Sequence, residues 1–322
     1  MLDDLDRKIL ALLDKDARTP INKIAIKLGI SRQLANNRLH HLEKNNLILG
    51  HFTIFDSGVL GFDLFRILIR LSSISKEEKI SIIDYLKNHP NIMWLGEVGG
   101  RWDIAANFSC HGHNNFNLIY EELSDKFGSF VNEAQILVYV DVFDYCRSYL
   151  YEEGVVRKIF YHRMINKPNI SIDALDIKII KHMSADARIS NTKLAKLIDS
   201  SRFVVKHRIE KMIKNKFIIG FRTFPRLNKI GYQSHMVFLK INKMNKERET
   251  ELYYYLQMLK QVTFVVKHLE AWRIGLEIET KNEEEFQDIL MRIRSQFNDL
   301  IADYDSFPLF KDHVINYFPR AL

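Results

Sequence analysis

Residues 16–43 read DARTPINKIAIKLGISRQLANNRLHHLE, and this stretch decides the fold of the first part of the chain. Apolar residues recur at helical spacing over residues 21–28. Gly29 then interrupts the pattern, and Ser31 is a favourable N-cap for a further helix. The apolar face of that helix consists of Ala35, Leu39 and Leu42. Two short helices joined by a short glycine-containing turn are typical of a helix-turn-helix motif.

The residues on either side of this stretch extend the motif. Before it, apolar residues at helical spacing predict another helix, so that residues 4–49 contain three. These residues are Leu5, Ile9, Leu12 and Leu13. After it, residues 47–52 are typical of a strand, which predicts a winged helix-turn-helix.

The same pattern returns 170 residues later in the chain. Leu5-Asp6 recurs as Leu175-Asp176, and Asp16-Ala17-Arg18 recurs as Asp186-Ala187-Arg188. Further pairs at this offset are Ser31 with Ser201, Arg32 with Arg202, Arg38 with Arg208, Gly50 with Gly220, Gly61 with Gly231, Trp102 with Trp272 and Phe116 with Phe286. A register kept without gaps predicts a tandem duplication.

The second part of each copy has a different pattern. Strand-like and helical stretches alternate in the order βαββαβ, which is the ferredoxin-like split βαβ motif. In copy one the strands are expected at 65–71, 92–98, 103–108 and 134–143, and the helices at 76–88 and 115–127. In copy two the elements are expected at 234–241, 245–259, 262–269, 273–279 and 283–297, followed by a less regular last strand through Pro308.

These patterns predict an α+β protein in which a unit made of a winged helix-turn-helix domain and a ferredoxin-like βαββαβ domain occurs twice. We expect a breaker cluster, Asn166-Lys167-Pro168-Asn169, to lie in the connector. The expected domains are two winged helix-turn-helix domains at 1–56 and 171–226, two βαββαβ domains at 60–145 and 230–322, and a connector at 146–170.

Composition narrows the class of protein. The net charge is +7, which is compatible with a polyanionic partner. Cys110 and Cys146 are isolated, so we expect reduced thiols and a cytoplasmic protein. The first residues are acidic, unlike a signal peptide, and no apolar run approaches the roughly 20 residues of a membrane helix.

A helix-turn-helix followed by βαββαβ resembles the Lrp/AsnC family of feast/famine transcription regulators. The resemblance is carried by Leu5-Asp6-x-x-Ile9-Leu10, Asp16-Ala17-Arg18, Leu28-Gly29-Ile30-Ser31, Arg38-Leu39-x-x-Leu42-Glu43, Ile48-x-Gly50, Leu60-Gly61 and Val98-Gly99-Gly100-Arg101-Trp102-Asp103. It implies a regulator that binds double-stranded DNA and forms homo-oligomers through its βαββαβ domains. Two fused copies could imitate a dimer. The family's usual glycine before the wing is Asn46 here and Lys216 in copy two, a change expected to affect the turn and not the fold.

The helix that begins after Ser31 would lie in the major groove, as would its counterpart after Ser201. With the apolar faces turned inward, the expected DNA-binding residues in copy one are Ser31, Arg32, Gln33, Asn36, Asn37, Arg38 and His40. In copy two they are Ser201, Arg202, Phe203, Lys206, His207 and Arg208. Arginine suits guanine, and asparagine or glutamine suits adenine. Arg38 and Arg208 would either touch phosphate or brace their helices.

Charge is unequal between the two copies. Residues 1–55 have a net charge of +3 and residues 171–226 a net charge of +8. This predicts that copy two supplies more of the salt-dependent, sequence-independent affinity. The alternative is that the helix-turn-helix folds serve as protein-interaction modules or are vestigial.

The resemblance also implies an effector, often an amino acid, that binds at loops of the βαββαβ domain. The candidate residues are Gly99, Gly100 and Asp103. Copy two has Leu269, Glu270, Ala271 and Arg273 at the matching positions, so we expect at most one conventional site per chain. The alternative is a tight Gly-Gly hairpin turn with a solvated aspartate.

An enzyme is the competing class, because siroheme decarboxylases share this two-domain architecture and can occur as fused pairs. Lys267, His268 and Arg273 are the loose candidates for such a site. We expect no enzyme, no catalytic residues, no cofactor and no metal. His111 and His113 are expected in a polar loop, and Asp141 and Asp144 are expected to face solvent.

Overall fold

A computed structural model describes residues 2–151, 157–163, 170–242 and 245–318 of the chain. The predicted breaker cluster at 166–169 lies outside these residues. The chain divides into two compact units, and neither corresponds to one copy of the repeat. Unit 1 consists of Met1–Asp56, Asp144–Phe160 and Ile170–Tyr232, and unit 2 of Ser57–Phe143, Tyr161–Asn169 and Gln233–Leu322.

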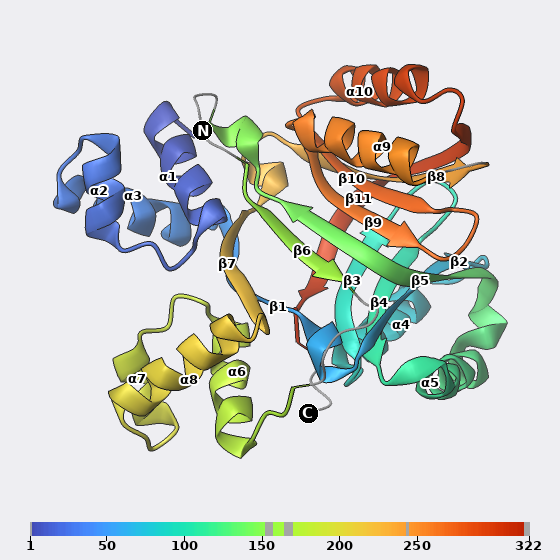
Figure 1. The fold of residues 1–322 in the computed structure, drawn as a ribbon. Coiled ribbons are helices and arrows are strands. Elements are labelled where there is room, and N and C mark those ends of the chain that lie inside the picture. Colours follow the sequence, from blue (N-terminus) through green and yellow to red (C-terminus); the bar gives the residue numbers. More distant parts are fainter. Residues whose placement is uncertain (1, 152–156, 164–169, 243–244, 319–322) are drawn as a thin grey trace. The chain divides into compact units, whose positions relative to one another are not determined.

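Unit 1 contains both helix-turn-helix motifs (Figure 1). Copy one supplies α1 (Asp4–Lys15), α2 (Ile21–Leu28), α3 (Arg32–Lys44) and strand β1 (Ile48–Phe55). Copy two supplies α6 (Ala174–Ala185), α7 (Asn191–Leu197), α8 (Arg202–Lys214) and strand β7 (Ile218–Pro225). Short 3-10 turns lie at Ser148–Leu150 and Leu227–Lys229. The two wing strands pair antiparallel with each other, from Ile48 opposite Pro225 to Phe55 opposite Ile218.

The repeated Asp-Ala-Arg motif joins the two copies within unit 1. The backbone N–H of Ala17 donates to the carbonyl of Phe221 at 3.0 Å, and that of Ala187 donates to the carbonyl of His51 at 3.0 Å. Arg18 donates to the carbonyl of Ala187, and Arg188 donates to the carbonyl of Ala17. Each copy therefore completes the other, as two subunits of a dimer would.

Unit 2 contains the two βαββαβ motifs. Copy one supplies β2 (Asp63–Leu71), α4 (Lys76–Asn88), β3 (Ile92–Val98), β4 (Ile104–Cys110), α5 (Gly112–Phe127) and β5 (Val131–Tyr145), with 3-10 turns at Ser57–Leu60 and Gly128–Phe130. Copy two supplies β8 (Gln233–Ile241), α9 (Lys246–Met258), β9 (Val262–His268), β10 (Ile274–Thr280), α10 (Glu283–Gln296) and β11 (Ile301–Ile315). A further strand, β6 (Ile159–Arg163), lies beside β5.

The strands of both copies form one sheet in the order β2-β4-β3-β11-β8-β10-β9-β5-β6. Because β2 also pairs with β5, the order of the first eight strands closes on itself. The long last strands make this closure: β11 pairs with β8 of its own copy and with β3 of the other, while β5 pairs with β2 and β9.

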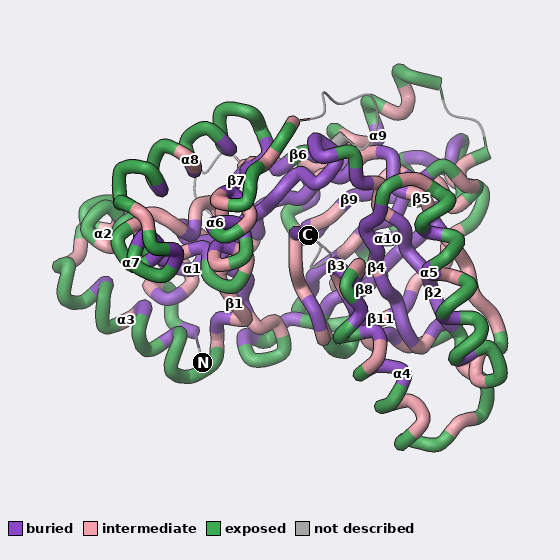
Figure 2. The backbone as a smooth tube through the Cα atoms, turned by 90° about the horizontal axis from the view of Figure 1, so that it is seen from below, coloured by how far each residue is buried: buried purple, intermediate pink, exposed green. Residues whose placement is uncertain are grey.

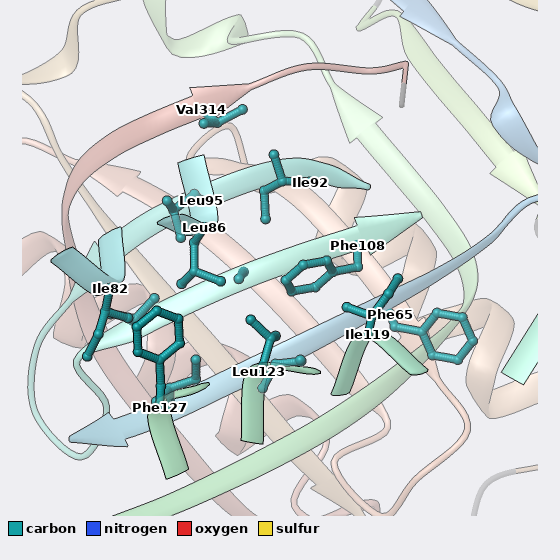
Figure 3. Close-up of a cluster of buried hydrophobic side chains, with 14 of the residues drawn as sticks. Phe65, Ile82, Leu86, Ile92, Leu95, Phe108, Ile119, Leu123, Phe127 and Val314 are labelled. Atoms are coloured by element: carbon teal, nitrogen blue, oxygen red, sulfur yellow. The ribbon is translucent and has the colours of Figure 1, made fainter. Parts of the chain in front are cut away.

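The strands alternate between two faces, as a period of two requires. On β2, Phe65, Ile67 and Ile69 belong to a core cluster beneath α4 and α5. Figure 3 shows Ile82 and Leu86 of α4 and Ile119, Leu123 and Phe127 of α5 meeting that face of the sheet. Leu68, on the opposite face of β2, packs instead with Phe238 and Phe307 of copy two.

The predicted α+β fold and its duplication are confirmed. Two details differ from expectation. The last strand of copy two, β11, extends beyond Pro308 and runs for 15 residues, which lets it pair with strands of both copies, and it contains register shifts in both pairings. Asn46 and Lys216 keep the left-handed backbone that favours glycine, with φ of 57° and 58°. The turn is therefore kept although the glycine is not.

Candidate nucleic-acid interface

Helix α3 is positioned by its local sequence. Gly29 ends α2 with φ of 65°, a backbone conformation that a residue with a side chain rarely adopts. Ser31 caps α3, and its hydroxyl accepts a hydrogen bond from the N–H of Leu34 at 3.1 Å. The apolar face of α3 is buried, which turns the remaining positions outward. The buried residues are Ala35, Leu39 and Leu42.

Most of the predicted reader residues of copy one are exposed. Figure 2 shows α3 largely in the colour of exposed residues. The exposed members are Ser31, Arg32, Gln33, Asn36, Asn37 and His40. The Gln33 amide donates to the side-chain oxygen of Asn37 at 2.9 Å, which holds these two amides together on one face of the helix.

The same positions are exposed on α8 in copy two. Ser201 caps the helix, and Val205, Ile209 and Met212 are buried. The exposed predicted residues are Ser201, Arg202, Phe203, Lys206 and His207. Phe203 is 84% exposed, more than any other exposed large hydrophobic side chain of the described chain.

Two exposed apolar side chains at the start of these helices were missed by sequence reasoning. Leu34 and Val204 are 39% and 41% exposed. Their position three residues after the caps Ser31 and Ser201 places them in the first turn, where a groove-binding helix approaches bases. The helical periodicity could have identified them, because neither lies on the buried face.

Arg38 and Arg208 brace their own modules. Arg38 lies 2.5 Å from Asp3 and 3.4 Å from Asp6, where α1 begins. Arg208 pairs in the same way with Asp173 and Asp176 at the start of α6. The backbone N–H of Asp6 is the main cause of the lowered pKa of Asp3, and the guanidinium of Arg38 lowers it further, while burial acts in the opposite direction. Of the two roles considered from the sequence, the geometry favours the brace.

The basic excess of copy two is partly used inside the protein. Arg188 and Arg208 make the contacts described above, and Arg226 donates to Asn46 at 3.0 Å. Arg222 is buried in a charged cluster. The charge that faces solvent on copy two is therefore smaller than the count of basic residues indicates.

That cluster lies at the centre of unit 1. Arg222 lies 2.5 Å from Asp14 of α1 and also pairs with Asp144, and Arg147 lies 3.2 Å from Asp14. Against the effect of its own burial, Arg222 has a raised pKa because these carboxylates face it, while burial raises the pKa of Asp144. The expectation that Asp144 faces solvent is wrong, since this residue at the end of β5 belongs to unit 1 and is buried there against Arg222.

The predicted effector residues lie at the junction of the two copies in unit 2. The N–H of Gly99 donates to the carbonyl of Pro308 at 3.0 Å, and a Cβ on Gly99 would lie 2.7 Å from the ring of Phe310. Asp103 accepts a hydrogen bond from the N–H of Leu71 at 2.8 Å. These glycines thus permit a close approach of the other copy's strand. Their role toward an effector stays a prediction.

The matching turn of copy two makes the reciprocal contact. The N–H of Leu269 donates to the carbonyl of Val138 at 3.1 Å. The carboxylate of Glu270 then accepts from the N–H of Val138 at 3.1 Å, a contact made by a side chain that copy one lacks.

Two of the loose enzyme candidates, Lys267 and His268, have side chains that are not brought together, while the N–H of His268 donates to the carbonyl of Arg273 at 2.8 Å. Lys267 and His268 are neighbours on β9, so they point to opposite faces of the sheet. Lys267 pairs with Glu249, whereas His268 is fully buried. His111 bonds to the carbonyl of Gly61 at 3.0 Å, and no group of three metal-ligating side chains occurs in the described ranges. No described helix is long and apolar enough to cross a membrane.

Comparison with known proteins agrees with the repeat. The AsnC-type helix-turn-helix domain matches at residues 2–43 and again at 172–213. The regulatory protein AsnC of Haemophilus influenzae is 36% identical over 111 residues, which are 34% of this chain and 73% of that protein. The transcriptional regulator AldR of Mycolicibacterium smegmatis is 31% identical over 110 residues, and the match spans 34% of this chain and only 64% of AldR.

A solved structure matches the duplicated architecture as a whole. The siroheme decarboxylase NirDL superposes with a TM-score of 0.63 at 12% sequence identity, over 99% of this chain and 96% of that one. This match corrects the expectation that the chain is not an enzyme: the architecture that led to it is also that of an enzyme, so it gives no ground for excluding one. At this identity the likeness shows the fold alone.

Proposed function

Because this chain belongs to the Lrp/AsnC family of regulators, as the sequence pattern indicated, we propose that it binds double-stranded DNA sequence-specifically and regulates transcription. One observation carries the proposal. Both copies leave the same outward positions of the recognition helix exposed, and most of these positions carry arginine, lysine, histidine or amide side chains. The exceptions are in copy two, where Phe203 and Glu210 stand at the positions of Gln33 and His40. A module kept only as a fold would not need this set twice.

The two helices offer different chemistry to a base pair. On α3, Arg32 can bind guanine, and the Gln33–Asn37 pair can bind adenine. On α8, Phe203 stands where Gln33 stands in copy one, and it offers only an apolar ring. Such a ring contacts the methyl group of thymine. The proposed site is therefore a pair of unlike half-sites.

The fused arrangement supports simultaneous binding by both helices. In unit 1 the copies share the β1–β7 pair and the reciprocal Arg18 and Arg188 contacts, so each motif is held by the other. Effector binding at Gly99, Gly100 and Asp103, and further association through the βαββαβ domains, remain proposals that rest on the family.

The test is fluorescence anisotropy with a duplex selected from a random pool, compared with a scrambled duplex at several salt concentrations. We expect a preference for the selected duplex and an affinity that falls with salt. Arg202→Ala should reduce the slope of log K against log salt by about 0.9. Arg70→Met, an exposed arginine of unit 2, is the charge-matched control and should leave the slope unchanged. Equal affinity for both duplexes at every salt concentration would refute the proposal.

A second candidate function is a decarboxylase that acts on a tetrapyrrole. It is supported by the full-length architecture shared with NirDL, which has also been solved with an iron-uroporphyrin III analogue. The test is an absorbance titration in the Soret region with iron uroporphyrin III, followed by a product assay with siroheme. Saturable binding and loss of carboxylate groups would establish it, and a flat titration would exclude it. Arg202→Ala should not alter either result.

A further inference from the structure

The first turn of α8 carries two exposed apolar side chains, those of Phe203 and Val204. The hydroxyl of the cap Ser201 accepts a hydrogen bond from the N–H of Val204 at 3.1 Å, which fixes where the helix begins. The core-facing residues of this helix are Val205, Ile209 and Met212. Phe203 is 84% exposed, so packing in the core of unit 1 does not account for this ring.

The repeat shows which of the two side chains is peculiar to copy two. Leu34 of α3 corresponds to Val204 and is 39% exposed, so both copies have an aliphatic side chain at this place. Phe203 corresponds to Gln33, whose amide donates to the side-chain oxygen of Asn37 at 2.9 Å. The same outward position is therefore a polar amide in copy one and a large apolar ring in copy two.

Cationic side chains flank this ring along the helix. Arg202 precedes Phe203 and Lys206 follows it by one turn, and both are exposed. Arginine binds guanine through O6 and N7, and lysine attracts phosphate. An apolar ring between cationic groups fits a polyanion that displays apolar groups of its own. Duplex DNA is such a polyanion, because the C5-methyl group of a pyrimidine lies in its major groove.

We infer that α8 recognises the C5-methyl group of a pyrimidine beside a guanine, whether that pyrimidine is thymine or 5-methylcytosine, an inference that rests on the proposed function. Both bases have the same methyl group at the same ring atom, whereas uracil and cytosine have only hydrogen there. Phe203 would cover the methyl group, and Arg202 would bind the guanine. An apolar ring makes no hydrogen bond that would distinguish O4 of thymine from the N4 amino group of cytosine. Methylation of cytosine at this place should therefore raise the affinity of the chain for DNA.

The size of the effect follows from the area that one methyl group removes from water. Burying a group of this size lowers the dissociation constant about fourfold. Leu34 and Val204 can each touch a methyl group, but a residue type that both copies share cannot make the copies differ. Gln33 is polar, so the half-site under α3 should lack the gain that Phe203 gives the half-site under α8.

The experiment uses the full chain and the duplex selected from a random pool. Fluorescence anisotropy at one salt concentration gives the dissociation constant for duplexes in which each thymine in turn is replaced by uracil. In a second series each thymine–adenine pair is replaced by a cytosine–guanine pair, with and without a C5-methyl group on the cytosine. At one position or more, uracil should weaken binding about fourfold, and 5-methylcytosine should bind about fourfold more tightly than cytosine at that position.

Three variants assign the effect to one side chain. Phe203→Gln gives α8 the residue of copy one and should bind methylated and unmethylated duplexes alike at that position. Phe203→Leu keeps an apolar side chain and should retain most of the methyl preference. Tyr254→Gln, which replaces an exposed aromatic residue of α9 in unit 2, should respond to the methyl group as the wild type does. Thermal unfolding verifies that each variant is folded.

The inference alone is overturned if the selected duplex is preferred but no replacement of thymine by uracil changes the dissociation constant. It is also overturned if the methyl preference keeps its full size in Phe203→Gln, because another side chain would then be responsible. In both cases the proposed function stands. If the selected duplex is bound no better than a scrambled one, the proposed function and this inference fail together.

Discussion

In copy one, α1 buries Asp14 against Arg222, whereas the matching positions of the repeat are Ser184 and Phe52. The Ser184 hydroxyl is buried without a partner, and Phe52 lies 5.0 Å from Phe224, ring centre to ring centre. The backbone contacts at the two places are nevertheless reciprocal. The symmetric relation between the two copies of unit 1 is thus maintained by reciprocal backbone hydrogen bonds, while the side chains at these positions have diverged. In a homodimer both sides of the interface must have the same sequence. In a fused chain each side can change independently, and this difference between the copies is an example.

The largest effect expected from this comparison concerns the buried charges. Asp14→Ala leaves Arg222 and Arg147 without their shared carboxylate, so it should lower the free energy of unfolding by about 3–5 kcal/mol. Ser184→Ala at the matching position removes only an unpartnered hydroxyl and should be neutral or stabilising. Urea denaturation of both variants measures this. An equal loss of unfolding free energy in Asp14→Ala and Ser184→Ala would contradict the proposed difference between the two copies.

The next effect is the pH dependence that His268 of copy two contributes, at a position where copy one has Val98. The folded pKa of His268 lies far below its unfolded value, so the unfolded chain binds a proton first as the pH falls. Stability should therefore drop by about 1.4 kcal/mol per pH unit below pH 6.5, or about 2 kcal/mol by pH 5.

His268→Val, which carries the residue of copy one, should remove this part of the pH dependence. The measurement is denaturant unfolding of both proteins between pH 7 and pH 5, a range that contains the ordinary histidine pKa of about 6.5. If the unfolding free energies of the two proteins changed in parallel with pH, His268 would bind its proton as readily in the folded as in the unfolded state, and the account would be contradicted.

The two recognition helices should differ in kind. Asn36→Ala on α3 should cost about 1–3 kcal/mol on a selected duplex and nothing on a scrambled one. Lys206→Ala on α8 should weaken both duplexes alike, because its ion pair with the exposed Glu210 contributes little and its remaining partner is phosphate. Anisotropy titrations at one salt concentration distinguish them. If both variants lost affinity for the selected and the scrambled duplex in the same proportion, the proposed difference between α3 and α8 would be refuted.

The smallest effect concerns the turn before each wing. Lys216→Gly should stabilise by about 1 kcal/mol, because a lysine is strained at φ of 58°. Asn46→Gly should gain less, since asparagine tolerates this conformation. Thermal unfolding of the two variants compares them, and a loss of stability in Lys216→Gly would contradict the account.

Much of the fold was readable in the sequence, because it rests on periodicity and on a repeat. The helix at 76–88 and the strand at 92–98 have the predicted bounds. The pairing of strands between the two copies could not be predicted, because the sequence of β5 or β11 alone does not determine which neighbouring strand it pairs with. Nor could the grouping of both helix-turn-helix motifs in one unit, which depends on long-range pairing of β1 with β7.

The candidate sites divide in the same way. Outward positions on α3 and α8 follow from helical spacing, so the exposed reader set was predictable. The burial of Asp144 was not, because it depends on Arg222 of the other copy, which faces it.

The claim that two unlike recognition helices read one DNA site is tested most directly by selection from random DNA. The wild type is compared with Gln33→Ala/Asn36→Ala and with Phe203→Ala/Lys206→Ala. The account predicts a non-palindromic motif in the wild type, with one half blurred in the first variant and a thymine-containing other half blurred in the second. A palindromic motif, or a motif unchanged by the second variant, would contradict it.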